Sequence, residues 1–210
     1  MSIYQPPAFV PQNSDAAWQL VHDYPFATLI TQTRDEPQIS HLPLLYRAEA
    51  ATQGVLIGHM ARANVHWQRF ADGPTLALFH GPHAYVSPSW YLEPDVAVPT
   101  WNYAVVHVRA RAAVVSDRES TLATVNALTQ RFESSRPEPW VLQLLGARLE
   151  AMLAAIVAFR LVIERVDAKF KLSQNRSADD GRRVAAALRD EGYADASATA
   201  DWMQHHGGNA

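Results

Sequence analysis

The chain has 210 residues, of which 48% are hydrophobic, and this is enough to build one substantial core. Its formal net charge is −3 with histidine neutral, so it lacks the basic excess by which nucleic-acid-binding proteins usually neutralise phosphates. The absence of cysteine excludes disulfides, thiolate metal sites and cysteine nucleophiles.

The N-terminal residues do not combine a basic segment with an apolar run, so no signal peptide is predicted. The longest apolar run, residues 154–159, is far shorter than the roughly 20 residues that a membrane-spanning helix needs. We therefore expect a soluble, cytoplasmic protein without membrane association.

The first third of the chain predicts a helix followed by short strands. Asn13 or Ser14 can cap a helix that Pro25 ends. Residues 26–33 alternate between two faces, and a polar turn at 34–37 leads into a strand at 39–45, which together predict a β-hairpin. Further along we expect a strand at 54–60, a short helix at 65–70 capped by Asn64, a strand at 75–80 and a turn at Gly81-Pro82.

The second half predicts longer elements and more helix. Residues 100–115 alternate and form the longest strand candidate, and Ser116 to Glu119 form a capping box that opens a helix to residue 133. We then expect a helix at 140–153, a strand at 156–166, a helix at 178–192 capped by Ser177, and a helix at 196–206. Hairpins early and helices late indicate an α+β protein with an antiparallel sheet or barrel.

Residues 56–108 have an unusual composition. They hold five of the nine histidines and three of the six tryptophans, mixed with glycine, proline and hydroxyl side chains. Such side chains hydrogen-bond and stack, whereas a packed core needs leucine, isoleucine and valine at a regular period. The stretch is typical of a pocket wall that holds a flat, polar-edged ligand, or of an aromatic dimer interface, and the two interpretations are compatible.

Four distinctive runs follow one another along the chain: Gly-His-Met-Ala-Arg-Ala-Asn (58–64), Gly-Pro-His-Ala-Tyr-Val-Ser-Pro-Ser-Trp-Tyr (81–91), Pro-Thr-Trp-Asn-Tyr (99–103) and Lys-Leu-Ser-Gln-Asn-Arg (171–176). In this order they resemble the PaiB-like family of FMN-binding negative transcriptional regulators. The resemblance extends from residue 4 to about residue 188. It implies a mostly antiparallel split β-barrel with flanking helices, related to pyridoxamine-phosphate oxidase, with FMN at a homodimer interface. We expect residues 1–192 to form this domain and residues 193–210 a C-terminal helical tail.

The turn around Arg62 and Asn64 is a candidate anion site. It lies between a strand end and a helix start, where backbone N–H groups can donate hydrogen bonds to an anion. Arginine adds a planar, charged guanidinium group whose geometry matches a phosphate. The alternative is a surface arginine paired with a carboxylate. Because split-barrel flavoproteins bind the FMN phosphate at this turn, the resemblance implies FMN contacts from His59, Met60, Ala61, Arg62 and Asn64.

The run 171–176 follows the last strand and crowds hydrogen-bond donors into six residues. A solvated loop before a helix is the simpler interpretation, but the resemblance implies that Lys171, Gln174 and Asn175 contact the flavin. The resemblance also implies that the strand carrying His41, Leu42 and Pro43 runs along the ring system, although His41 is equally explained as a half-buried strand histidine. Pro43 itself indicates a sheet edge or a bulge.

Residues at the start of the longest strand complete the predicted site. Thr100 and Asn102 can donate hydrogen bonds while Trp101 stacks on a ring, and in the family's architecture these residues can come from the second subunit. No histidine–carboxylate arrangement accompanies Ser87 or Ser89, so a serine hydrolase is disfavoured. The spacing of the histidines does not predict a metal site, because Gly81-Pro82 separates His80 from His83 and no carboxylate is near.

We thus expect a cytoplasmic, homodimeric FMN-binding protein that acts as a flavin-linked or redox-linked regulator, with a small-molecule ligand as a further partner. The alternative is a flavin-dependent oxidase or reductase of a small molecule at the same site, and haem binding by the histidines stays open. Direct DNA binding is not expected, because residues 196–206, the second helix of the only helix pair suited to it, contain no arginine or lysine.

Overall fold

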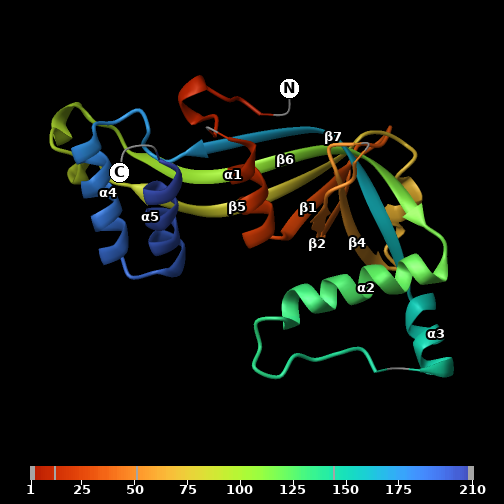
Figure 1. Ribbon diagram of the computed structural model, residues 1–210. Helices are drawn as coiled ribbons and strands as arrows, with labels where there is room; N and C mark the ends of the chain where they lie inside the picture. The colour runs from red at the N-terminus through yellow and green to blue at the C-terminus, as the bar shows by residue number, and fades with distance from the viewer. Residues whose placement is uncertain (1–2, 12, 51, 144, 208–210) are drawn as a thin grey trace. The chain divides into compact units, whose positions relative to one another are not determined.

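The computed structural model describes residues 3–11, 13–50, 52–143 and 145–207 (Figure 1). The α-helices are α1 (Ser14–Asp23), α2 (Arg118–Glu133), α3 (Gly146–Ala154), α4 (Ala178–Asp190) and α5 (Ala194–His206). The strands are β1 (Phe26–Thr31), β2 (Gln38–Pro43), β3 (Leu45–Arg47), β4 (Val55–Ala61), β5 (Thr75–Val86), β6 (Thr100–Val115) and β7 (Ile156–Lys171). Short 3₁₀ helices are η1 (Pro7–Phe9), η2 (Val65–Arg69), η3 (Pro88–Trp90) and η4 (Pro94–Val96).

The strands form a sheet in the order β2-β1-β5-β6-β7-β4-β3. β1 pairs antiparallel with β2 and with β5, and β4 pairs antiparallel with β3 and with β7. The β1–β2 hairpin brings Thr28 opposite His41 and Phe26 opposite Pro43. The predicted α+β class with an antiparallel sheet is confirmed. Pro43 lies on β2, the first strand in this order, as its missing N–H predicted.

The chain divides into two compact units, and β5, β6 and β7 each contribute residues to both. The first unit comprises Met1–Tyr24, Phe79–His107 and Asp167–Ala210, and the second comprises Pro25–Leu78 and Val108–Val166. Below we call them the terminal unit and the middle unit. The boundary predicted between residues 192 and 193 stays a prediction.

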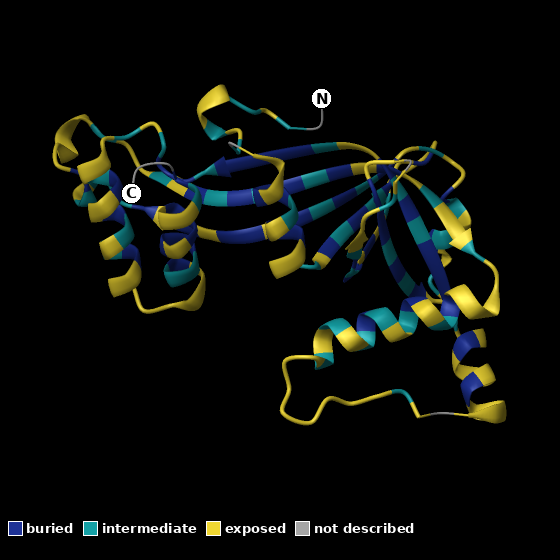
Figure 2. Cartoon of the chain, viewed as in Figure 1, coloured by how far each residue is buried: buried dark blue, intermediate teal, exposed yellow. Residues whose placement is uncertain are grey.

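The core of the middle unit is built from the inward faces of the strands. Ala27, Leu29 and Thr31 are buried while the residues between them are not, so β1 alternates as its sequence predicted. Phe70, at the end of η2, packs edge-to-face on Phe159 of β7, with ring centroids 5.3 Å apart. Helices α2 and α3 belong to this unit, and the segment between them is exposed over nearly its whole length (Figure 2).

The core of the terminal unit joins α1, the ends of β5–β7 and the C-terminal helices. Trp202 of α5 packs against Phe170 of β7, with centroids 5.3 Å apart, and against Tyr24 at 6.0 Å. Asn13 caps α1 by accepting from the Ala16 N–H at 3.0 Å, and Ser177 caps α4 by accepting from the Asp180 N–H at 3.1 Å. Both caps, and the C-terminal helix α5, were predicted.

Three local predictions were wrong. Gly81 and Pro82 do not form a turn but continue β5; a Cβ on Gly81 would lie 2.9 Å from Leu20 Cδ1, so glycine permits α1 to approach the strand here. The helix expected from residue 140 begins only at Gly146. Gly146 has a φ of 57°, and a right-handed helix cannot continue through a residue with this backbone conformation. The cap of α2 is Asp117 rather than Ser116, with Asp117 Oδ1 accepting from the Ser120 N–H at 2.7 Å.

None of the helices in the described ranges combines the length and the apolar character that crossing a bilayer requires.

Candidate functional site

Arg62 follows β4 directly and is anchored to the turn between α3 and β7. Its Nε donates to the Ala154 carbonyl at 2.5 Å and its Nη2 donates to the Ile156 carbonyl at 2.7 Å. Its backbone N–H donates to the Ala155 carbonyl at 2.8 Å, and its own carbonyl accepts from Trp67 Nε1 at 3.1 Å. Arg62 therefore satisfies carbonyl groups at a helix C-terminus, where a cation is favoured. Among the residues that the structure describes, these bonds leave the second terminal guanidinium nitrogen, Nη1, for a ligand.

A cavity of about 390 Å³ adjoins Arg62 within the middle unit. Its polar lining consists of Arg62, Ser116, Arg118, Thr121 and Glu150, and its apolar lining includes Trp67, Leu153 and Val157. Arg118 donates from both Nε and Nη2 to Glu150 Oε1, at 2.9 and 2.5 Å, and this arginine holds the pKa of the Glu150 carboxyl below its usual value. Two guanidinium groups against one carboxylate leave the cavity positively charged, which suits an anion.

Ser116 and Arg118 were not predicted as site residues. Their sequence signal was interpreted only as the start of α2, although an arginine beside a hydroxyl at a helix N-terminus is also a phosphate-binding pattern. The pattern is too common to single out this turn without knowing that it faces Arg62.

A buried polar network fixes the turn that follows Arg62. His66 is 1% exposed; its Nδ1 lies 2.8 Å from Ser40 Oγ and its Nε2 lies 2.9 Å from Thr31 Oγ1. Asn64 Nδ2 donates to the same Ser40 hydroxyl at 3.0 Å, and Asn64 Oδ1 accepts from the His66 N–H at 3.1 Å. Burial lowers the pKa of His66 below 6.5, so the ring is neutral. The side-chain amide of Asn64 thus caps η2, as predicted, and also bonds to Ser40 of β2.

The other predicted residues of the middle unit lie on β2 and β4. His41 is exposed and its Nδ1 lies 3.1 Å from Thr28 Oγ1 on the neighbouring strand, whereas Leu42 is buried. Met60 is buried and Ala61 is exposed at the end of β4. His59 is half-buried, burial lowers its pKa, and its buried Nδ1 has no hydrogen-bond partner within the part of the chain that the structure describes. An unpaired buried imidazole nitrogen marks a place where a ligand could supply the missing partner.

The remaining predicted residues meet in the terminal unit, at the start of β6 and the end of β7. The Lys171 ammonium donates to Thr100 Oγ1 at 2.5 Å and to the Trp101 carbonyl at 2.7 Å. Burial, together with the charges of Lys169 and Arg176, lowers the pKa of Lys171. Trp101 is 52% exposed, and its ring centroid lies 6.3 Å from that of His83. A cationic group and an open aromatic face are therefore adjacent here.

Two predicted donors of this unit serve the fold. Asn102 is completely buried, and its Nδ2 donates to Ser173 Oγ at 2.9 Å and to Met203 Sδ at 3.2 Å. Gln174 Nε2 donates to the Phe170 carbonyl at 2.5 Å, and its Oε1 accepts from the Leu172 N–H at 2.7 Å. Asn175 is exposed. Of this predicted group, only Asn102 is fully buried, and Lys171, Trp101 and Asn175 have surface to offer a ligand.

The structure thus gathers the predicted residues into two groups, one in each unit. The turn after β4 meets β2 through Ser40 in the middle unit, and Lys171 meets the start of β6 in the terminal unit. Within the described ranges no three histidine, aspartate or glutamate side chains converge as a metal site would require.

The family model described as "Putative FMN-binding domain" matches residues 3–165. The chain belongs to this FMN-binding family. It is 32% identical over 204 residues to the protease synthase and sporulation protein PAI 2 of Bacillus subtilis, covering 96% of this chain and 97% of that protein. It is also 28% identical to an uncharacterised protein of Emericella nidulans, covering 83% of this chain and 85% of that one. The PaiB-like resemblance and its cofactor, FMN, are confirmed.

Solved structures are similar in fold at low identity. The flavocytochrome Anf3 of Azotobacter vinelandii has a TM-score of 0.60 at 11% identity, covering 77% of this chain and 69% of that chain. The FAD and heme binding protein of Mycobacterium smegmatis has a TM-score of 0.56 at 16% identity, covering 76% and 71%. The predicted split-barrel fold is thereby confirmed.

The donor set fits FMN, which carries a dianionic phosphate and a flat ring edged with hydrogen-bond acceptors. Arg62, Arg118 and Ser116 around the middle-unit cavity are of residue types that bind phosphate groups in proteins. Lys171 and the exposed Trp101 supply a donor and a stacking face.

Proposed function

We propose that this protein is an FMN-binding homodimer of the PaiB-like type that acts as a flavin-linked regulator. The observation that carries the proposal is the family match over residues 3–165 together with a cationic cavity beside Arg62. Similarity to PAI 2 over nearly the whole of both chains supports a regulatory role, because that relative is named for protease synthesis and sporulation.

The phosphate end of FMN binds in the middle-unit cavity, at Arg62 and Arg118. Arg62 is held in place by two backbone carbonyls, so little side-chain entropy is lost when its free nitrogen meets a phosphate oxygen. Arg118 lies at the N-terminus of α2, where the helix dipole adds to its charge. Ser116 supplies a hydroxyl donor in the same cavity, whereas the Thr121 hydroxyl donates to the Asp117 carbonyl at 2.9 Å.

In the terminal unit, Lys171 and Trp101 are the proposed contacts for a flavin ring. Lys171 is pre-oriented by Thr100 and by the Trp101 carbonyl, and the nearby charges of Lys169 and Arg176 favour an electron-rich partner. Bound flavin supplies the electron transfer, while these side chains bind and orient it. We expect residues of both subunits to contact one flavin, as the PaiB-like resemblance implies.

Regulation works through a partner protein or through flavin chemistry. Helix α5 has no arginine or lysine, and Ala196, Thr199, Ala200, Trp202 and Met203 are buried in the terminal unit. A helix that reads DNA needs basic side chains to pair with the phosphates, and α5 has no arginine or lysine to do so.

The test compares FMN with riboflavin, which lacks the phosphate, by titrating cofactor-free protein and following the quenching of flavin fluorescence. Arg118→Ala should weaken FMN binding about 30-fold, equivalent to about 2 kcal/mol, because a charge-assisted hydrogen bond is lost. Riboflavin affinity should change less than about threefold. Arg62→Ala should show the same selectivity, although it also frees the carbonyls of Ala154 and Ile156.

Arg111→Ala is the matched control, because Arg111 is exposed and pairs with Glu164 at 3.1 Å in the same unit. It should leave both affinities unchanged. If the Arg118 and Arg62 variants lost FMN and riboflavin affinity equally, the phosphate would not bind in this cavity. A protein that binds neither flavin would overturn the assignment as a whole.

A further inference from the structure

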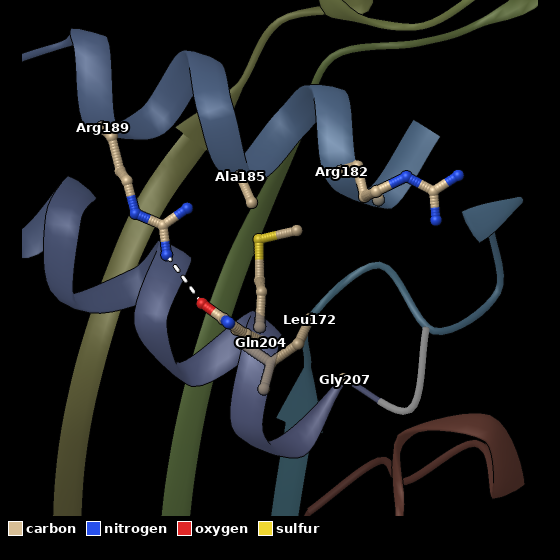
Figure 3. Close-up of a pocket in the computed structure, with 8 residues that line it drawn as sticks. Leu172, Arg182, Ala185, Arg189, Gln204 and Gly207 are labelled. Carbon is tan, nitrogen blue, oxygen red and sulfur yellow. Dashed lines mark hydrogen bonds between the residues drawn. The ribbon is translucent and has the colours of Figure 1, made fainter. Parts of the chain in front are cut away.

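A second cavity, of about 350 Å³, lies within the terminal unit among α4, α5 and the residue after β7 (Figure 3). It is lined by Leu172, Gly181, Arg182, Ala185, Arg189, Met203, Gln204 and Gly207. All of these residues follow residue 165, where the family match ends, and none belongs to the proposed flavin contacts. Its volume is at the lower end of the range for small-molecule sites.

The interior of this cavity is apolar. Leu172 and Met203 are almost completely buried beneath it, and Ala185 on α4 adds a methyl group. Gly181 precedes Ala185 by four residues, so both occupy the same helix face, and their small size opens the space between the helices. Such a surface suits the ring of a small aromatic or alicyclic compound.

The charged groups that line the cavity are all positive. Arg182 and Arg189 are seven residues apart on α4, about 10 Å along the helix axis, and they flank Ala185 (Figure 3). Their acidic partners, Asp179 for Arg182 and Asp201 for Arg189, are not among the lining residues. Arg189 Nη2 also donates to Gln204 Oε1 at 3.1 Å, which holds the guanidinium at the rim.

We propose that this cavity binds a small aromatic carboxylate, with its ring against Leu172, Ala185 and Met203 and its carboxylate on Arg189. The apolar interior selects the ring and the cationic rim selects the charge, because guanidinium and carboxylate form a charge-assisted pair. This gives the protein a ligand site separate from its flavin.

The test uses calorimetric titration of FMN-loaded protein with 2-naphthoate and with its neutral isostere, 2-naphthamide. Naphthoate should bind with a Kd of about 1 mM or tighter, as expected for a ligand of its size, and naphthamide at least about tenfold more weakly. Arg189→Gln removes the charge and keeps a polar side chain that can donate a hydrogen bond, so it should weaken naphthoate binding about tenfold and leave naphthamide binding unchanged.

A pair of neighbouring substitutions tests the location. Ala185→Phe fills the cavity and should abolish binding of naphthoate, whereas Ala186→Phe, at an exposed position on the same helix, should not affect it. Circular dichroism checks that each variant is folded; if Ala185→Phe does not fold, Arg189→Gln decides the question alone. Absence of naphthoate binding, equal affinity for the two probes, or binding unaffected by Arg189→Gln would overturn the proposal.

Discussion

Removing the imidazole of His66 should destabilise the protein by about 3 kcal/mol at pH 8. His66→Ala deletes two hydrogen bonds of a fully buried ring, to Ser40 and to Thr31, each worth about 1 kcal/mol. It also leaves an empty space beside Phe70, whose centroid lies 5.5 Å from that of the imidazole, and this adds at least about 1 kcal/mol. His80→Ala is the control, because His80 is exposed and its loss should cost less than about 0.5 kcal/mol.

Acidification should reduce this difference. Burial lowers the folded-state pKa of His66 below the value of about 6.5 expected in the unfolded chain, so below pH 6.5 the unfolded chain takes up a proton that the folded protein does not. The stabilisation is complete above pH 6.5 and is lost as the pH falls, at no more than about 1.4 kcal/mol per pH unit. His59 and His206 also have lowered pKa values but are present in both proteins, so the difference between wild type and His66→Ala isolates His66.

The assay is urea unfolding followed by far-ultraviolet circular dichroism from pH 8 to pH 5, at a fixed saturating FMN concentration because bound ligand adds to stability. The gap between wild type and His66→Ala should narrow below pH 6.5. A gap that is smaller than about 1 kcal/mol at pH 8, or one that widens on acidification, would refute the role assigned to the neutral, doubly bonded ring.

Two further predictions concern partners. Trp101→Ala should lower dimerisation, measured by sedimentation, together with FMN affinity, measured by titration, since Trp101 is half exposed beside His83 and Tyr85. Trp140→Ala, at an equally exposed tryptophan, is the control and should change neither quantity. The reverse pattern would place the dimer interface on the middle unit. Mobility-shift titrations at physiological salt should detect no tight, sequence-specific DNA binding, because the net charge is −3 and α5 has no arginine or lysine. Nanomolar, salt-sensitive binding to one DNA fragment would contradict this prediction.

The sequence by itself determined the elements whose signals are local. The caps at Asn13, Asn64 and Ser177 are hydrogen bonds between neighbours in the chain, so the residue type alone predicts them. The alternation of residues 100–115 predicted β6 with its observed bounds, and four motifs identified the family and its cofactor. These inferences need no knowledge of which segments meet.

Only the tertiary structure decided which donors are left for a ligand. Asn102 and Gln174 had the right chemistry for a flavin, yet both are satisfied within the terminal unit because burial obliges polar groups to find internal partners. Gly81-Pro82 continues a strand, and glycine is needed at position 81 because Leu20, 61 residues earlier, packs against the place of a Cβ. Arg118 faces the same cavity as Arg62 because α2 and the end of β4 meet in space, and their separation of 56 residues conceals this from any local pattern.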